Sequence, residues 1–127
     1  MSDESERETQ LLGNMLLAVY TLLHRVCGLL PIPITLPDFD GDTLQGAEMN
    51  EAVTRVVEVI ADEPVDELIQ AGLWGAGLHW LSASHLLSRY METGEDIVAL
   101  EIRINIVTAH DGLHAVEDLL LQDDPDA

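Results

Sequence analysis

The residue types best suited to chemistry in this sequence are its five histidines. His110 and His114 are four residues apart, so on a helix they share one face, and Glu117 continues the same ridge. Two imidazoles and a carboxylate are a sufficient ligand set for zinc or iron. His79, expected on the core-facing side of another helix, is a further candidate ligand. These four residues together predict a metal site with zinc or iron as the cofactor.

A structural role is the competing interpretation of the same histidines. The sequence contains no HExxH, no pair of ExxH motifs and no CxxC, the spacings that identify many metal sites. His110 and His114 also flank an apolar stripe, where histidine commonly borders a packing contact. For His79, a hydrogen-bonded histidine in the core is the alternative.

Two acidic segments offer sites for hard cations. Asp38, Asp40 and Asp42 have the one-three-five rhythm of a calcium loop, although the glycine stands at the fourth place instead of the sixth. The segments 48–51 (EMNE) and 63–66 (EPVD) resemble the ExxE and ExxD motifs of all-α nucleotide pyrophosphohydrolases, which hold magnesium on adjacent helices. This resemblance implies a magnesium-dependent nucleotide hydrolase, but the sequence lacks the basic residues that a phosphate site needs.

The charge balance offers a common explanation for both acidic segments. The 127 residues include 24 acidic and 5 basic residues, all arginine, which gives a formal net charge of −19. The acidic residues occur in every part of the chain, whereas an acidic patch that captures a basic partner is concentrated. We therefore interpret the acidity as adaptation to molar salt, where self-repulsion is screened, and expect the fold to be destabilised at low salt.

The same balance excludes several classes of function. Direct contact with nucleic acid relies on lysine and arginine, and docking on anionic membranes needs a basic surface. The most apolar stretch, residues 11–36, contains polar residues and prolines that predict no membrane span. The acidic N-terminus is unlike a signal peptide, and the single cysteine, Cys27, suits a reducing compartment. We expect a high-salt cytoplasm or a virion as the location.

Apolar periodicity predicts an all-α fold in a single domain. Four segments have helical spacing, and short connections between them predict an antiparallel four-helix bundle with helices at about 9–30, 47–61, 64–92 and 95–121. Asp62 is the expected N-cap of the third helix. Residues 1–8 and 123–127 are expected to be acidic tails, and the prolines of 31–37 predict a short extended segment.

The fourth segment also has the pattern of a strand. Leu100, Ile102, Ile104 and Ile106 alternate with polar residues, and isoleucine suits a strand. A helical stripe continues from Val98 for more than twenty residues, so the sequence favours a helix over 98–107.

Apolar surface and small residues indicate a role in assembly. The first helix is apolar around most of its circumference, and glycines inside the third helix suggest close approach of another helix. We therefore expect a structural or interaction protein, a helical subunit of a homo-oligomer or larger assembly such as a virion or connector of a halophile system. Its partners are then copies of itself or other protein subunits. The predicted interface residues are Leu12, Leu16, Val19, Leu23, Gly72, Trp74 and Gly75.

Overall fold

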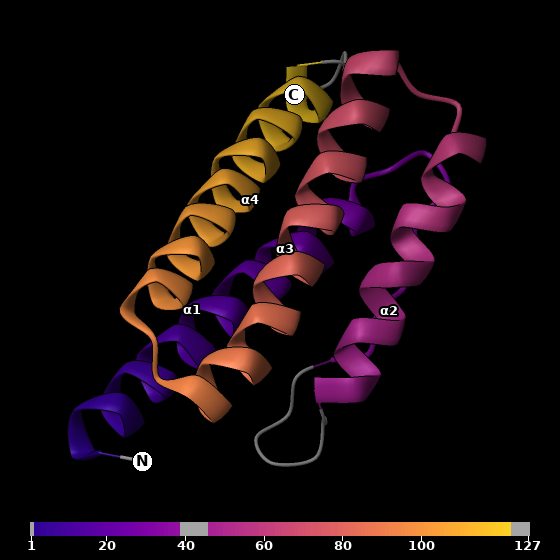
Figure 1. The fold of residues 1–127 in the computed structure, drawn as a ribbon. Coiled ribbons are helices and arrows are strands. Elements are labelled where there is room, and N and C mark those ends of the chain that lie inside the picture. The colour runs from indigo at the N-terminus through magenta and orange to yellow at the C-terminus, as the bar shows by residue number, and fades with distance from the viewer. Residues whose placement is uncertain (1, 39–45, 123–127) are drawn as a thin grey trace.

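Four long helices account for most of the chain in the computed structural model, which describes residues 2–38 and 46–122 (Figure 1). They are α1 (Asp3–Gly28), α2 (Gly46–Val59), α3 (Glu67–Thr93) and α4 (Asp96–Gln122), with a 3-10 turn, η1 (Ile60–Asp62), after α2. The described ranges contain no strand. The prediction of an all-α four-helix bundle is confirmed, and the segment 98–107 is helical.

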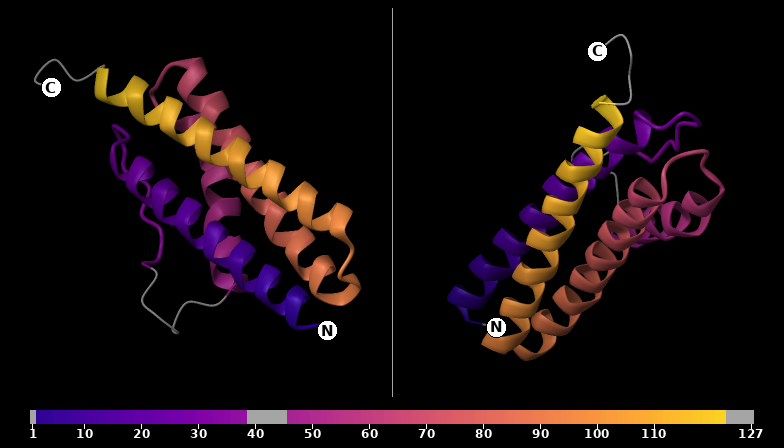
Figure 2. Two further views of the ribbon diagram at one scale, coloured as in Figure 1. Left: turned by 90° about the vertical axis from the view of Figure 1, so that its left-hand side faces the viewer. Right: turned by 90° about the horizontal axis from the view of Figure 1, so that it is seen from above.

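The helices do not simply alternate in direction. α3 runs antiparallel to α2 and α4, while α1 runs in the same direction as α4 (Figures 1 and 2). Two ion pairs fix this parallel arrangement, since Glu8 pairs with Arg103 and Arg25 with Glu117. α2 begins beside the N-terminal half of α1, where Gly46 and Gly13 line one groove. Residues 33–38 contain neither helix nor strand.

The prediction of an acidic tail at 1–8 is wrong for residues 3–8, which form the first turns of α1. Ser2 caps the helix, because its side chain accepts a hydrogen bond from the Ser5 N–H at 3.1 Å. Acidic residues in the first turn suit the positive end of the helix dipole. Glu8, which looked like part of a free tail, is held by Arg103 of α4. Residues 123–127 lie outside the described ranges.

The start of α3 also differs from the prediction. Asp66, and not Asp62, is the N-cap, and its carboxylate accepts a hydrogen bond from the Leu68 N–H at 2.9 Å. Proline disfavours helical backbone in the residue before it, and Glu63 before Pro64 is extended. η1 therefore ends at Asp62, and α3 begins only after the proline.

The core is built around α1. Eight of its residues are buried, and they include the predicted interface residues Leu12, Leu16, Val19 and Leu23. Trp80 of α3 packs against this helix and donates a hydrogen bond from Nε1 to the Leu16 carbonyl at 2.9 Å. Much of the apolar surface of α1 is thus covered by the same chain, although Leu11 remains 46% exposed.

By length and composition, α1 also meets the requirements for a membrane-spanning helix, and no other helix in the described ranges does so. Core helices of soluble proteins and signal sequences near an N-terminus meet the same requirements. The absence of a membrane span stays a prediction.

The glycines of α3 face different surroundings. A Cβ built on Gly72 would overlap the Val116 side chain of α4, and one on Gly77 would lie 2.6 Å from Cγ2 of Val57 in α2. A Cβ on Gly75 would meet nothing within 4 Å. The close helix approach that the glycines predicted is therefore made inside the chain, at Gly72 and Gly77.

Gly72 and Gly75 form a matched pair for a test of this packing. Gly75→Ala is expected to raise the free energy of unfolding by about 1 kcal/mol, because alanine favours the helix and fits the open space. Gly72→Ala gains the same helix propensity, but it forces the Val116 side chain to move. This movement is expected to lower the free energy of unfolding by about 1–3 kcal/mol. Urea denaturation of both variants measures the difference, and equal stability would contradict this account of α3–α4 packing.

Candidate functional site

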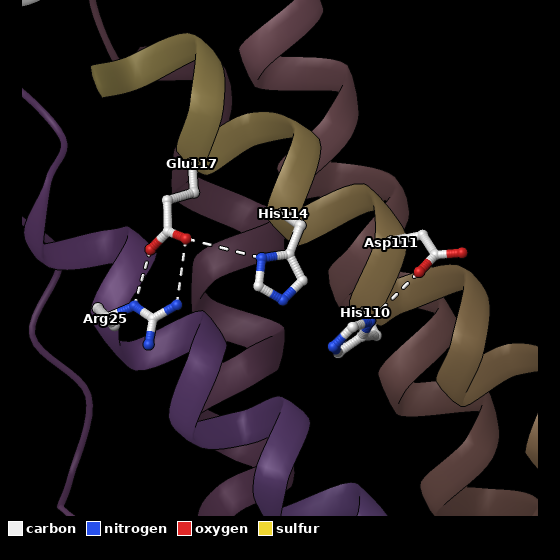
Figure 3. Close-up of polar contacts among 5 residues, drawn as sticks. All are labelled: Arg25, His110, Asp111, His114 and Glu117. Carbon is white, nitrogen blue, oxygen red and sulfur yellow. Dashed lines mark hydrogen bonds and ion pairs between the residues drawn. The ribbon is translucent and has the colours of Figure 1, made fainter. Parts of the chain in front are cut away.

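The histidine ridge lies on the C-terminal half of α4, beside α1 (Figure 3). The rings of His110 and His114 meet edge to face, with centroids 4.5 Å apart. Nδ1 of His110 lies 3.2 Å from Oδ1 of Asp111, and Nδ1 of His114 lies 3.7 Å from Oε1 of Glu117. Both imidazoles are about half exposed, at 50% and 47%. The helical spacing alone brings these rings together, as the sequence predicted.

Glu117 is bound by an arginine from α1. The Arg25 guanidinium donates from Nε to Oε2 at 2.7 Å and from Nη2 to Oε1 at 3.1 Å, so the pair is bidentate. This hydrogen-bonded cation lowers the pKa of the Glu117 carboxyl, and the pKa of Arg25 is raised in turn. Each carboxylate oxygen of Glu117 therefore accepts a hydrogen bond from Arg25.

His79 is not part of this ridge. Its Nδ1 lies 2.8 Å from Oδ1 of Asn105, in the contact between α3 and α4. The predicted gathering of His79 with His110, His114 and Glu117 is therefore wrong. Across residues 2–38 and 46–122, no group of three or more histidine, cysteine, aspartate or glutamate side chains is placed to hold a metal ion.

The acidic segments do not form a common site either. Glu48 and Glu51 are exposed on α2. Glu63 is 7% exposed and accepts a hydrogen bond from the Ile32 N–H at 3.2 Å, while Asp66 caps α3. The structure thus gives two of the four motif carboxylates a backbone partner.

Two of the three aspartates in the predicted calcium loop, Asp40 and Asp42, lie outside the described residues. Oδ1 of the third, Asp38, lies 2.8 Å from Nε2 of His24 in α1. This contact connects the polar end of the 33–38 segment to α1.

α4 also carries an exposed apolar surface that its periodicity did not predict, and we call it the outer face of α4. It consists of Ile97, Leu100, Ile104 and Val107, which are 58%, 51%, 59% and 50% exposed. Their spacing of three, four and three residues places them on one side of the helix, opposite the buried stripe. The sequence did contain a signal for this surface, namely apolar residues at every second position from 100 to 106. In the helix, two of these residues are buried and two are exposed, so the helix is apolar on two faces.

The remaining predicted interface residues lie on α3. Trp74 is 54% exposed and lines an apolar pocket with residues of α2, η1 and the start of α3. Gly75 faces open space, and Gly72 packs inside the chain. Leu12, Leu16, Val19 and Leu23 lie in the core, so they are not available to a second subunit in this fold. The apolar side chains that remain exposed are better candidates for an interface.

Comparison with known proteins adds no relative: no family model, no curated protein and no solved structure matches this chain.

The pKa of Glu117 provides a test of the contact between α1 and α4. Replacing Arg25 with methionine is expected to raise the pKa of Glu117 toward its ordinary value, while Arg55→Met, an exposed arginine on α2, leaves it unchanged. Carboxyl NMR titration measures both variants. The Arg25–Glu117 pair stabilises the fold at pH values above about 4.3, the pKa of a glutamate in the unfolded chain. This stabilisation is lost as the pH falls through the lower pKa of Glu117 in the folded protein. An unchanged Glu117 titration in Arg25→Met would contradict the bidentate pair.

Cys27 is expected to be unreactive in the folded protein. Its side chain is fully buried, and this burial raises the pKa of the thiol to about 12. The thiolate is the reactive form, so a thiol reagent at roughly pH 8 should label Cys27 only on unfolding. Ser88→Cys adds an exposed thiol on α3 as a matched control, which should react at once. Fast labelling of two thiols in this variant would show that Cys27 is accessible.

Proposed function

We propose that this protein is a helical subunit that associates with copies of itself through the outer face of α4. The observation that carries the proposal is the set of four large apolar side chains at half exposure on one face of a helix whose other face is already buried. Single exposed apolar residues are common on proteins, but a continuous stripe marks an interaction surface.

The spacing of this face suits a second copy as the partner. Residues at three- and four-residue steps form the seam of paired helices, with each side chain inserted between residues of the facing helix. If two copies of α4 pair antiparallel about a two-fold axis, Ile97 meets Val107 of the second copy and Leu100 meets Ile104. Every member of the face then has an apolar partner, and the contact is closed, as in most homo-oligomers.

The charge distribution supports an apolar contact over an ionic one. Only 5 of the 127 residues are basic, and two of them, Arg25 and Arg103, pair with carboxylates of their own chain. Few cations therefore remain to attract another acidic copy. Salt screens the repulsion between two chains of charge −19, so association through the outer face of α4 should strengthen as salt is added.

Salt adaptation is part of the same proposal. Most of the described acidic side chains lie on the surface, on all four helices, and not around one cavity. A surface of this kind stays soluble in concentrated salt and repels itself in dilute buffer. Assembly in a high-salt cytoplasm or a virion is consistent with this surface.

Association is tested by placing a charge in the middle of the outer face of α4. Sedimentation equilibrium of the native chain is expected to show an oligomer at roughly 2 M KCl and dissociation at roughly 0.1 M. Ile104→Glu is expected to remain a monomer in both buffers. Ile32→Glu is the matched control, since Ile32 is 58% exposed and Ile104 is 59% exposed, and it should associate like the native chain.

Three results would overturn the proposal. They are a native chain that is monomeric in both buffers, association that weakens as salt is added, and association that survives Ile104→Glu. The second result would indicate a contact between opposite charges, and the third would place the contact on another surface, such as the one around Trp74.

A further inference from the structure

The two imidazoles of α4 lie next to each other on one exposed ridge. Histidines at positions i and i+4 of one helix face are the spacing with which helices bind a single zinc ion. Here the ring centroids of His110 and His114 are 4.5 Å apart, and both rings are about half exposed. A metal ion from solvent therefore reaches both rings without any change in the core.

A neighbouring carboxylate lies beside Nδ1 of each ring. Asp111 lies 3.2 Å from Nδ1 of His110, and Glu117 lies 3.7 Å from Nδ1 of His114 (Figure 3). A carboxylate beside Nδ1 favours the tautomer with the proton on that atom, and it leaves the lone pair of Nε2 free. Metal-binding histidines commonly have such a carboxylate on the nitrogen that does not bind the metal. His110 has such a partner within hydrogen-bond distance, and Glu117 is the carboxylate close to His114.

Arg25 gives Glu117 an orienting role. The guanidinium occupies both carboxylate oxygens at 2.7 and 3.1 Å, so the carboxylate is fixed in place on the surface of α4. It can attract the Nδ1 proton of His114 from this position, but it does not complete a ligand set of three. The remaining coordination positions of a bound ion are then open to water or to another molecule.

We infer that Nε2 of His110 and Nε2 of His114 bind one divalent transition-metal ion, zinc or copper, with Asp111 and Glu117 as positioning residues. Imidazole nitrogen suits zinc and copper, whereas magnesium and calcium prefer oxygen ligands. This preference separates the site from the carboxylates of an acidic surface, which attract any divalent cation. The inference does not depend on association through the outer face of α4.

Isothermal titration of the full chain with zinc chloride, in a large excess of magnesium chloride, tests the site. Magnesium occupies the exposed carboxylates, and one zinc equivalent is still expected to bind. His110→Ala and His114→Ala should each weaken zinc binding by at least about 10-fold, the lower limit found even for orienting partners. His85→Ala is the matched control, because His85 is an exposed histidine on α3, and its zinc affinity should equal that of the native chain.

Three further measurements separate a metal site from general charge attraction. Copper should bind more tightly than zinc, as expected for nitrogen ligands. Asp111→Asn keeps both ligands and should lower the zinc affinity by roughly 10-fold, because the orienting carboxylate is lost. Imidazole NMR signals of His110 and His114 should shift together on zinc addition, with those of His79 unchanged.

The inference is overturned if excess magnesium abolishes zinc binding, or if either single histidine variant binds zinc like the native chain. It is also overturned if His85→Ala weakens binding as much as His110→Ala. Far-UV circular dichroism establishes that each variant keeps its helices. Asp111→Asn with native affinity would remove the positioning role of Asp111 and leave that of the two ligands.

Discussion

The close contact between α3 and α4 determines most of this structure. It is the most extensive helix contact in the described chain. Gly72 leaves room for the Val116 side chain, and Gly112 of α4 lies opposite the backbone of Gly72. Gly94, with φ of 65°, makes the turn that joins the two helices. The packing of α3 against α4 at these glycines determines which side of α4 is buried and which side is exposed to solvent.

The position of α1 depends on the packing of α3 against α4. α1 packs against both α3 and α4. A buried hydrogen bond from Trp80 of α3 to the Leu16 carbonyl helps to position α1 along α3. Arg103 and Arg25 then pair with Glu8 and Glu117 at the two ends of the contact. Because only 5 of the 127 residues are basic, these internal pairs leave few cations among the acidic side chains of the surface.

α4 therefore carries two surfaces of different chemistry. Its N-terminal half presents apolar side chains, which contribute more to binding as salt screens the charges around them. Its C-terminal half presents the half-exposed imidazoles of His110 and His114, the pair for which we propose metal binding. Neither surface needs the core to move. The described residues place no three-ligand metal group on this ridge. The carboxylate nearest to His114 is instead paired with Arg25, which lies 92 residues away in the sequence.

Local periodicity determined what the sequence could reveal by itself. Apolar spacing predicted four helices to within a few residues at most ends, and the spacing of His110 and His114 placed both rings on one ridge. Such features depend on neighbours three or four residues apart, which a sequence shows directly. The helical start at residues 3–8 was missed although Ser2 and the acidic first turn are local signals, and its contact with Arg103 of α4 is tertiary.

The tertiary structure alone decided how these faces are used. Gly72 and Gly75 look equivalent in the sequence, yet one contacts α4 and the other faces open space. Leu16 and Ile104 are both apolar residues of amphipathic spacing, and only the first is buried. Burial depends on the packing of all four helices together, so no local pattern specifies which apolar face of α4 remains exposed.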